Sequence, residues 1–191
     1  MKKLLLLLTL LFFMLPLSAR QPAKGYRGFV DWNNDIRSQN TDIGRLTDFY
    51  TGVSTSHGYQ ITPWIYTGAG IVFECSKNAS TYYYILAPFA DIRSDLKFGK
   101  FTPFVDIRIG YNFSDYSGMD ITKDEGGLYF SPAIGYRFNW GRKMGVNLGV
   151  GLTLKGYSNN PIFIYTPDGF QFWKYDNGVF SYFSFRVGID F

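Results

Sequence analysis

The chain closes on Val179-Phe-Ser-Tyr-Phe-Ser-Phe-Arg-Val-Gly-Ile-Asp-Phe191, a stretch in which residue character alternates. Every second residue from Phe183 to Phe191 is apolar, and the residues between them are small, polar or charged. A period of two indicates a strand with one apolar and one polar face. Its apolar face must therefore be covered, either by a protein core or by lipid.

The bulk composition favours a single β-rich domain. Of 191 residues, 20% are aromatic, 18% are charged and 21 are glycine. Aromatic and glycine enrichment suits strands with rings at interfaces and glycines where backbones crowd. The mean hydropathy of −0.07 argues against a helical membrane protein, whereas a barrel wall hides its apolar residues by alternation.

Charge and cysteine content exclude two classes of protein. The formal charge of +4 includes Lys2 and Lys3, and losing them with a leader leaves 4 − 2 = +2. This small excess comes without a Lys/Arg run or a stacking motif, so we expect no nucleic-acid partner. Cys75 is the only cysteine, which excludes an intramolecular disulfide, and we interpret it as an incidental loop residue.

The first 19 residues have the pattern of a secretory signal peptide. Lys2 and Lys3 form a positive end, a mostly apolar core follows from Leu4 to Leu15, and Ser18-Ala19 offers a small-residue cleavage site. The core is too short to span a bilayer, which takes about 20 apolar residues. We therefore expect residues 20–191 to form one exported domain.

Eight alternating stretches follow, separated by turn-forming residues. The expected strands cover 26–33, 46–57, 64–74, 82–95, 101–113, 127–139, 144–157 and 179–191. The connections near 58–63, 96–100 and 140–143 are short, and those near 34–45, 75–81, 114–126 and 158–177 are mostly longer and more polar. Short turns at one end and long loops at the other are typical of outer-membrane barrels, with both termini on the periplasmic side.

A soluble barrel or sandwich also alternates, so periodicity alone leaves it open. Three features favour a membrane barrel: the leader, the rings near strand ends, and polar faces too sparse to solvate a soluble exterior. The expected fold is all-β, an eight-stranded antiparallel up-and-down transmembrane β-barrel.

The architecture and the closing Phe-Arg-Val-Gly-Ile-Asp-Phe resemble the small eight-stranded bacterial outer-membrane barrels, the OmpX/OmpA-like group. The resemblance covers about residues 25–191. It implies the outer membrane of a Gram-negative envelope, and it implies that the terminal Phe191 is a signal read by the outer-membrane assembly machinery. It does not imply a particular function.

Charged residues with inward parity form the first candidate site. They are Arg27, Asp31, Asp91, Arg93, Asp106, Arg108, Arg137 and Arg186. An eight-stranded barrel is just wide enough for side chains to fill it, so charges inside must pair. With a tight turn at 96–100, Asp91 is expected roughly opposite Asp106. We interpret the set as a salt-bridged plug, with a gate or ion path as the alternative.

His57 is the only histidine and is the second candidate. Barrel-embedded lipid hydrolases use a His with a Ser and an acidic residue, and Ser54, Ser56 and Asp48 are near in sequence. However, His57 is expected at the periplasmic turn, and Ser56 has the opposite parity. We therefore interpret His57 as a turn cap.

An aromatic segment before the last strand is the third candidate. Proline and Asp-Gly between two β-prone runs predict a hairpin, which would continue the last two strands beyond the membrane as a ribbon. Its rings are Phe163, Tyr165, Phe170, Phe172, Trp173 and Tyr175. They suit binding of a protein, a glycan or lipopolysaccharide sugars, or else packing on other loops or at the outer-leaflet interface.

These observations predict a non-enzymatic envelope protein with a plugged lumen that acts through its surface loops, in adhesion, surface binding or a structural role. A small channel or transporter is the first alternative, and a lipid-modifying enzyme is the second. No catalytic, cofactor-binding or metal-binding residues are expected. The expected partners are outer-membrane lipids, lipopolysaccharide, the assembly machinery and an extracellular protein or glycan, and the chain is expected to be monomeric.

Overall fold

The computed structural model describes residues 24–41, 44–78, 81–96, 100–117, 126–140, 144–165 and 171–191. The expected signal peptide, residues 1–19, lies outside the described residues. All described elements are strands, and the described part of the chain holds no helix long and apolar enough to cross a membrane.

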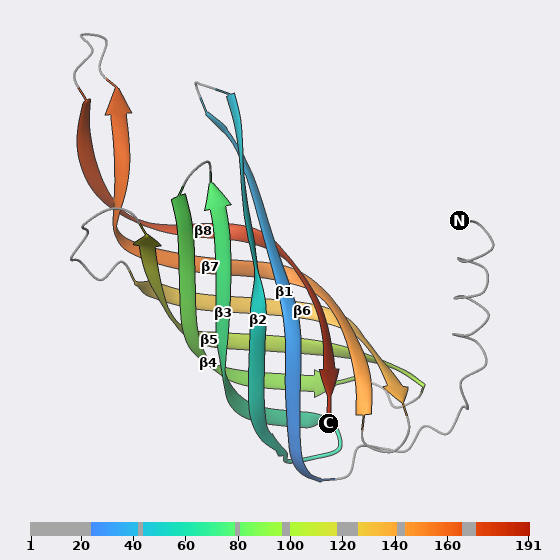
Figure 1. Ribbon diagram of the computed structural model, residues 1–191. Coiled ribbons are helices and arrows are strands. Elements are labelled where there is room, and N and C mark those ends of the chain that lie inside the picture. Colours follow the sequence, from blue (N-terminus) through green and yellow to red (C-terminus); the bar gives the residue numbers. More distant parts are fainter. Residues whose placement is uncertain are drawn as a thin grey trace, which may run out of the picture.

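The strands form one closed antiparallel barrel in which neighbours in sequence are neighbours in space (Figure 1). Their bounds are β1 Gly25–Thr41, β2 Gly44–Gln60, β3 Ile65–Asn78, β4 Thr81–Asp95, β5 Phe101–Ser117, β6 Gly127–Trp140, β7 Met144–Tyr165 and β8 Gln171–Asp190. β1 pairs with β8 from Phe29 opposite Asp190 to Ile36 opposite Phe183 and closes the ring. The fold class predicted from the alternation is confirmed.

The barrel has two different ends. At one end, called the turn end, lie the start of β1, the end of β8 and the short connection between β2 and β3 (Figure 1). At the other, called the loop end, the β1–β2 hairpin and the β7–β8 ribbon extend past their neighbours (Figure 1).

The prediction of a loop near 34–45 is wrong, because β1 runs to Thr41 and β2 begins at Gly44. The segment is polar, which suggests a loop, but its inward residue Asp35 faces a lumen that is itself polar. β2 likewise continues to Gln60, so the turn expected from Gly58 begins later.

Side-chain burial is the reverse of that in a soluble barrel. On β7, Asn147, Thr153 and Lys155 are buried, whereas Leu152 is 52% exposed. The same holds around the ring, where each strand exposes large apolar side chains: Trp32, Val53, Ile71, Leu86, Ile109, Ile134, Leu152 and Phe183. A continuous apolar exterior around a polar interior is the pattern of a barrel whose wall faces lipid.

The packed core therefore lies inside the barrel. Two groups of apolar side chains are buried there: Val72, Ala87, Phe89 and Tyr129 in one, and Tyr50, Ile85 and Tyr182 in the other. The remaining interior is filled by charged and polar side chains, which make up the candidate functional site.

Candidate functional site

The structure places all eight inward-parity charges inside the barrel, each at most 6% exposed. Alternation explains this, because every second residue of a barrel strand points into the lumen. Together with further buried residues, seven of these side chains belong to three layers along the barrel axis, and the eighth, Asp91, is buried beside them.

The turn-end layer contains three arginines and two aspartates. Arg27 lies 3.0 Å from Asp95 and 3.2 Å from Asp190, so it joins β1 to β4 and β8. Arg137 also pairs with Asp190, at 2.5 Å, and Arg93 lies 3.5 Å from Asp95. Both carboxylates thus pair with two guanidinium groups each, and the layer as a whole keeps one net positive charge. Sequence reasoning missed Asp95 and Asp190 as partners in the charge network.

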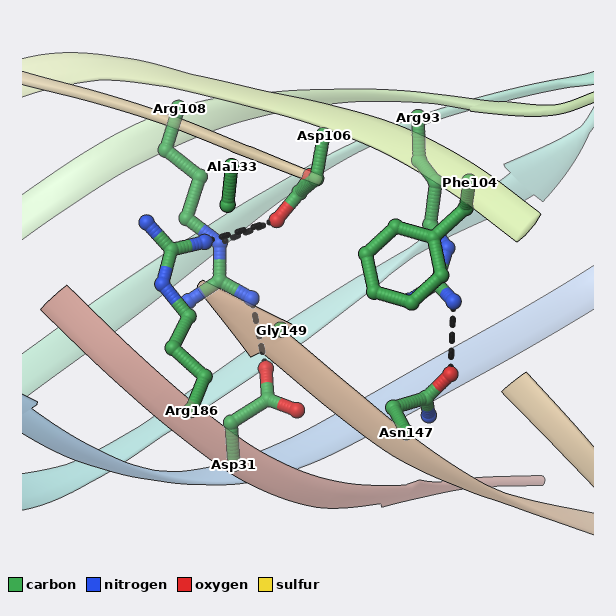
Figure 2. A pocket seen from close by; sticks show the side chains of 9 residues that line it. All are labelled: Asp31, Arg93, Phe104, Asp106, Arg108, Ala133, Asn147, Gly149 and Arg186. Atoms are coloured by element: carbon green, nitrogen blue, oxygen red, sulfur yellow. Dashed lines mark hydrogen bonds and ion pairs between the residues drawn. The ribbon is translucent and has the colours of Figure 1, made fainter. Parts of the chain in front are cut away.

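The middle layer links β1, β5 and β8 (Figure 2). Arg108 lies 2.5 Å from Asp31 and 3.3 Å from Asp106. Arg186 lies 2.7 Å from the same Asp106 and also donates to the hydroxyl of Ser131. Figure 2 shows the two guanidinium groups lying next to each other, with their carboxylate partners around them.

The loop-end layer centres on Lys155 of β7, a residue that the predicted charge network does not include. Its ammonium lies 2.5 Å from Glu74 and 2.7 Å from Asp35, and all three side chains are at most 1% exposed. The same ammonium lies 4.4 Å from the ring centroid of Tyr50 and 4.8 Å from that of Tyr182. A buried ammonium is tolerated here because two carboxylates and two ring faces replace its hydration.

The expected position of Asp91 opposite Asp106 is wrong. In the β4–β5 ladder, Asp91 lies opposite Arg108, and Arg93 lies opposite Asp106. The register differs by two residues from that of the tight turn assumed at 96–100. Opposite charges therefore face each other across this strand pair, which favours the ladder.

Aromatic rings fill the space that the ion pairs leave. The guanidinium of Arg93 lies 3.4 Å from the ring centroid of Phe104 and 4.8 Å from that of Phe29. Arg108 lies 5.0 Å from the ring centroid of Phe89. The cavity lined by the middle layer measures about 10 Å³, which is room for about one water molecule. Ion pairs and rings thus fill the lumen around this cavity.

His57 lies on the outward face of β2 and does not cap a turn, because the strand continues to Gln60. Its Nδ1 lies 2.5 Å from the Tyr26 hydroxyl and its Nε2 lies 2.8 Å from the Thr55 hydroxyl. The structure does not bring Ser56 to it, since Ser56 is buried in the lumen and hydrogen-bonded to Tyr66. Chemically, this is an imidazole held between two hydroxyl groups at the turn end.

The terminal Phe191 completes the seam between the first and last strands. Its backbone N–H donates to the Gly28 carbonyl at 3.1 Å, and the Gly28 N–H donates to the Phe191 carbonyl at 2.9 Å. A Cβ at position 28 would lie 2.8 Å from two Phe191 ring atoms, so the ring occupies a notch beside Gly28 and would have to shift to make room for a side chain there. The ring also packs edge-on against His57, at 6.4 Å.

The backbone of the predicted ribbon is present at the loop end. β7 and β8 pair from Asn160 opposite Asp176 to Tyr165 opposite Gln171, beyond an irregularity between Tyr157 and Asn160. Phe170 lies outside the described residues, as do the side chains of the other binding candidates: Phe163, Tyr165, Phe172, Trp173 and Tyr175. Among the described residues, no three His, Cys, Asp or Glu side chains gather as a metal site would require.

The barrel and its charged interior define a class, the small eight-stranded outer-membrane β-barrel fold. Several solved structures share it. Neisserial surface protein A superimposes with a TM-score of 0.59 at 13% identity, over 91% of this chain and 97% of that one. Ail, the attachment invasion locus protein of Yersinia pestis, superimposes with a TM-score of 0.52 at 8% identity, over 88% of this chain and 100% of that one. OprG from Pseudomonas aeruginosa superimposes with a TM-score of 0.50 at 10% identity, over 89% of this chain and 97% of that one.

These likenesses confirm the fold expected from the resemblance. No family model matches the chain, and no curated protein matches it. At such identities the shared feature is the barrel itself.

Proposed function

We propose that this chain is an outer-membrane protein of a Gram-negative envelope that acts without enzymatic chemistry, through the parts that extend beyond the membrane. In this proposal residues 1–19 are a cleaved signal peptide and residues 20–191 form the mature barrel. The turn end faces the periplasm and the loop end faces the outside of the cell. The barrel itself is a sealed support, inserted as a monomer by the outer-membrane assembly machinery.

The exterior supports the membrane location. Exposed aromatic side chains lie toward both ends of the barrel: Trp64 and Trp140 lie close to the turn end, and Tyr82 and Phe113 lie toward the loop end. Aromatic rings at the two interfaces flank the apolar band of outer-membrane barrels. The apolar band is thus the surface that lipids, and lipopolysaccharide in the outer leaflet, would cover.

The observation that carries the proposal is the filled lumen combined with the long ribbon. A lumen crossed by buried ion pairs is a poor route for solutes, which favours a support over a channel. The ribbon, in contrast, continues to Tyr165 and Gln171, whereas the pairing between β6 and β7 stops at Tyr129 and Lys155. A paired ribbon beyond the wall offers strand edges and faces to a protein or glycan partner.

A ribbon replacement tests this function. Residues 158–177 would be replaced by an Asn-Gly turn, which closes two-residue hairpins. The matched control replaces residues 118–125, in the connection between β5 and β6, by the same turn. Both proteins and the wild type would be reconstituted in nanodiscs and assayed against a glycan array and immobilised extracellular-matrix proteins.

We expect binding by the wild type and the control, and its loss in the ribbon variant. A change in gel mobility on heating, which reports a folded barrel, verifies that each variant has inserted. Equal binding by the ribbon variant, or no binding by any of them, would overturn the proposed role of the ribbon.

A further inference from the structure

We propose that the outer wall carries a binding site for one phospholipid of the periplasmic leaflet, in a groove across β5, β6 and β7 with Lys100 beyond its turn-end rim. The inference rests on the proposed membrane orientation. It adds a ligand class and a site that the ribbon does not use.

The groove is apolar and large enough for an acyl chain. It measures about 430 Å³, within the range of about 300–1,000 Å³ typical of small-molecule pockets. Its walls are outward side chains of successive strands: Pro103, Val105, Ile134, Tyr136, Leu148 and Val150. Ladder pairs align these walls, with Val105 opposite Ile134 and Tyr136 opposite Leu148.

Backbone forms the floor of the groove. Gly135 and Gly149 lie opposite each other in the β6–β7 ladder, between the wall residues, and both line the groove. Both have inward parity, so a side chain at either position would point toward the lumen residues Phe104 and Arg186 and not into the groove. The ring of Phe104 adds to this floor from the lumen side, where it stacks on Arg93. The floor is therefore fixed by the packed interior.

Lys100 lies beyond the turn-end rim of the groove. Phe101 and Pro103 are successive outward residues of β5, and the Phe101 ring packs edge-on against Phe138 at 5.2 Å. The Lys100 ammonium lies 5.8 Å from the Phe101 ring centroid. The Lys100 carbonyl accepts a hydrogen bond from the Asn139 N–H at 3.1 Å, which anchors this backbone to the end of β6. An apolar groove with an ammonium beyond its rim matches an acyl chain below a phosphate.

The position of the groove along the barrel axis determines which membrane leaflet it faces. β5 begins at Phe101, β6 ends at Trp140 and β7 begins at Met144, so the groove adjoins the turn end. In the proposed orientation this is the periplasmic leaflet, which consists of phospholipid, whereas lipopolysaccharide occupies the outer leaflet. The groove is continuous with the lipid-facing band, since Ile134 and Tyr136 are among its exposed side chains.

Native mass spectrometry of refolded residues 20–191 in a mild detergent tests the site. The probes are palmitoyl-oleoyl phosphatidylglycerol, a diacylglycerol with the same chains, and lipid A. Leu148→Trp fills the groove, and Leu152→Trp adds the same ring on the same outward face of β7, outside it. Lys100→Glu reverses the charge beyond the rim. Gel mobility before and after heating verifies that each barrel is folded.

We expect a one-to-one phosphatidylglycerol complex in the wild type, and about a tenfold loss in Leu148→Trp, the effect of losing contacts with about two methylene groups. Leu152→Trp should retain the complex, and Lys100→Glu should abolish the preference for phosphatidylglycerol over diacylglycerol. Equal retention by both tryptophan variants, equal binding of lipid A, or a dimer that Leu148→Trp dissociates would overturn the proposal. Its failure would leave the ribbon assays unaffected, so the two proposals fail separately.

Discussion

Lys155 and Glu74 form an ion pair across the full width of the barrel, with Nζ 2.5 Å from Oε2 and both side chains completely buried. Lys155 belongs to β7 and Glu74 to β3, which are opposite each other in the ring of eight strands. Arg108 on β5 and Asp31 on β1 form a second pair between opposite strands. These cross-lumen pairs explain why the interior is filled, because long charged side chains from both walls meet at the axis.

Removing the buried ammonium should destabilise the barrel strongly. Lys155→Met keeps most of the volume but leaves Glu74 and Asp35 buried together without a cation. Breaking a buried ion pair by removing one partner costs about 3–5 kcal/mol. Urea unfolding in lipid vesicles, followed by tryptophan fluorescence, measures the loss in free energy of unfolding.

Glu74→Gln is the matched comparison for that substitution. Lys155 then keeps Asp35 at 2.7 Å, and the amide still offers an oxygen to the ammonium. The loss in free energy of unfolding should be clearly smaller than for Lys155→Met. Equal losses would mean that the charge on Lys155 does not hold this layer together.

The middle layer should respond in the same way. Arg108→Met removes the cation that pairs with Asp31, and we expect the free energy of unfolding to fall by about 3–5 kcal/mol. Arg37→Met removes an arginine that lies 3.9 Å from the partly exposed Asp48, where an ion pair is worth about 0–1 kcal/mol. The Arg37 guanidinium also lies 3.9 Å from the Phe180 ring centroid, a contact worth about 0.5–1 kcal/mol at exposed sites. Similar unfolding midpoints for the two variants would count against the ion-paired plug.

The absence of a side chain at Gly28 should be needed to accommodate the ring of Phe191. Gly28→Ala places a Cβ 2.8 Å from Phe191 ring atoms and should cost about 1–3 kcal/mol of stability through overpacking. Gly178→Ala is the control, since its nearest contact would be 3.6 Å. In a Phe191→Ala background, Gly28→Ala should no longer lower the free energy of unfolding. If it still does, the Phe191 ring is not the group with which a side chain at position 28 collides.

His57 should contribute to stability and to no reaction. His57→Ala removes the hydrogen bonds to Tyr26 and Thr55, and each is worth about 0.5–1.5 kcal/mol. Mass spectrometry of phospholipids and lipopolysaccharide incubated with the wild type should show no fatty-acid release. Release by the wild type that is lost in His57→Ala would make the chain a lipid-modifying enzyme.

The alternation of apolar and polar residues sufficed to predict the barrel and to predict which charged side chains point into the lumen. The ion partners could not be predicted in this way, because parity fixes the face of a residue but not the register. Asp91 faces Arg108, and not Asp106, because the connection after Asp95 shifts the ladder by two residues. Contacts across the lumen, such as Arg108 with Asp31, further depend on the stagger of strands around the ring.

The loop-end layer was missed for a different reason. Asp35 lies in a polar segment that resembles a loop, and Glu74 lies at the expected end of its strand. Both belong to strands that continue past these points, β1 to Thr41 and β3 to Asn78. The signal that could have identified them is Lys155, an inward lysine that requires buried acidic partners.

The most direct test of the account is planar-bilayer conductance of residues 20–191, refolded in detergent. Because buried ion pairs cross the lumen and its middle cavity holds about one water molecule, the wild type should insert without conductance steps. Reproducible conductance steps from folded wild-type protein would contradict the sealed lumen and make the chain a channel.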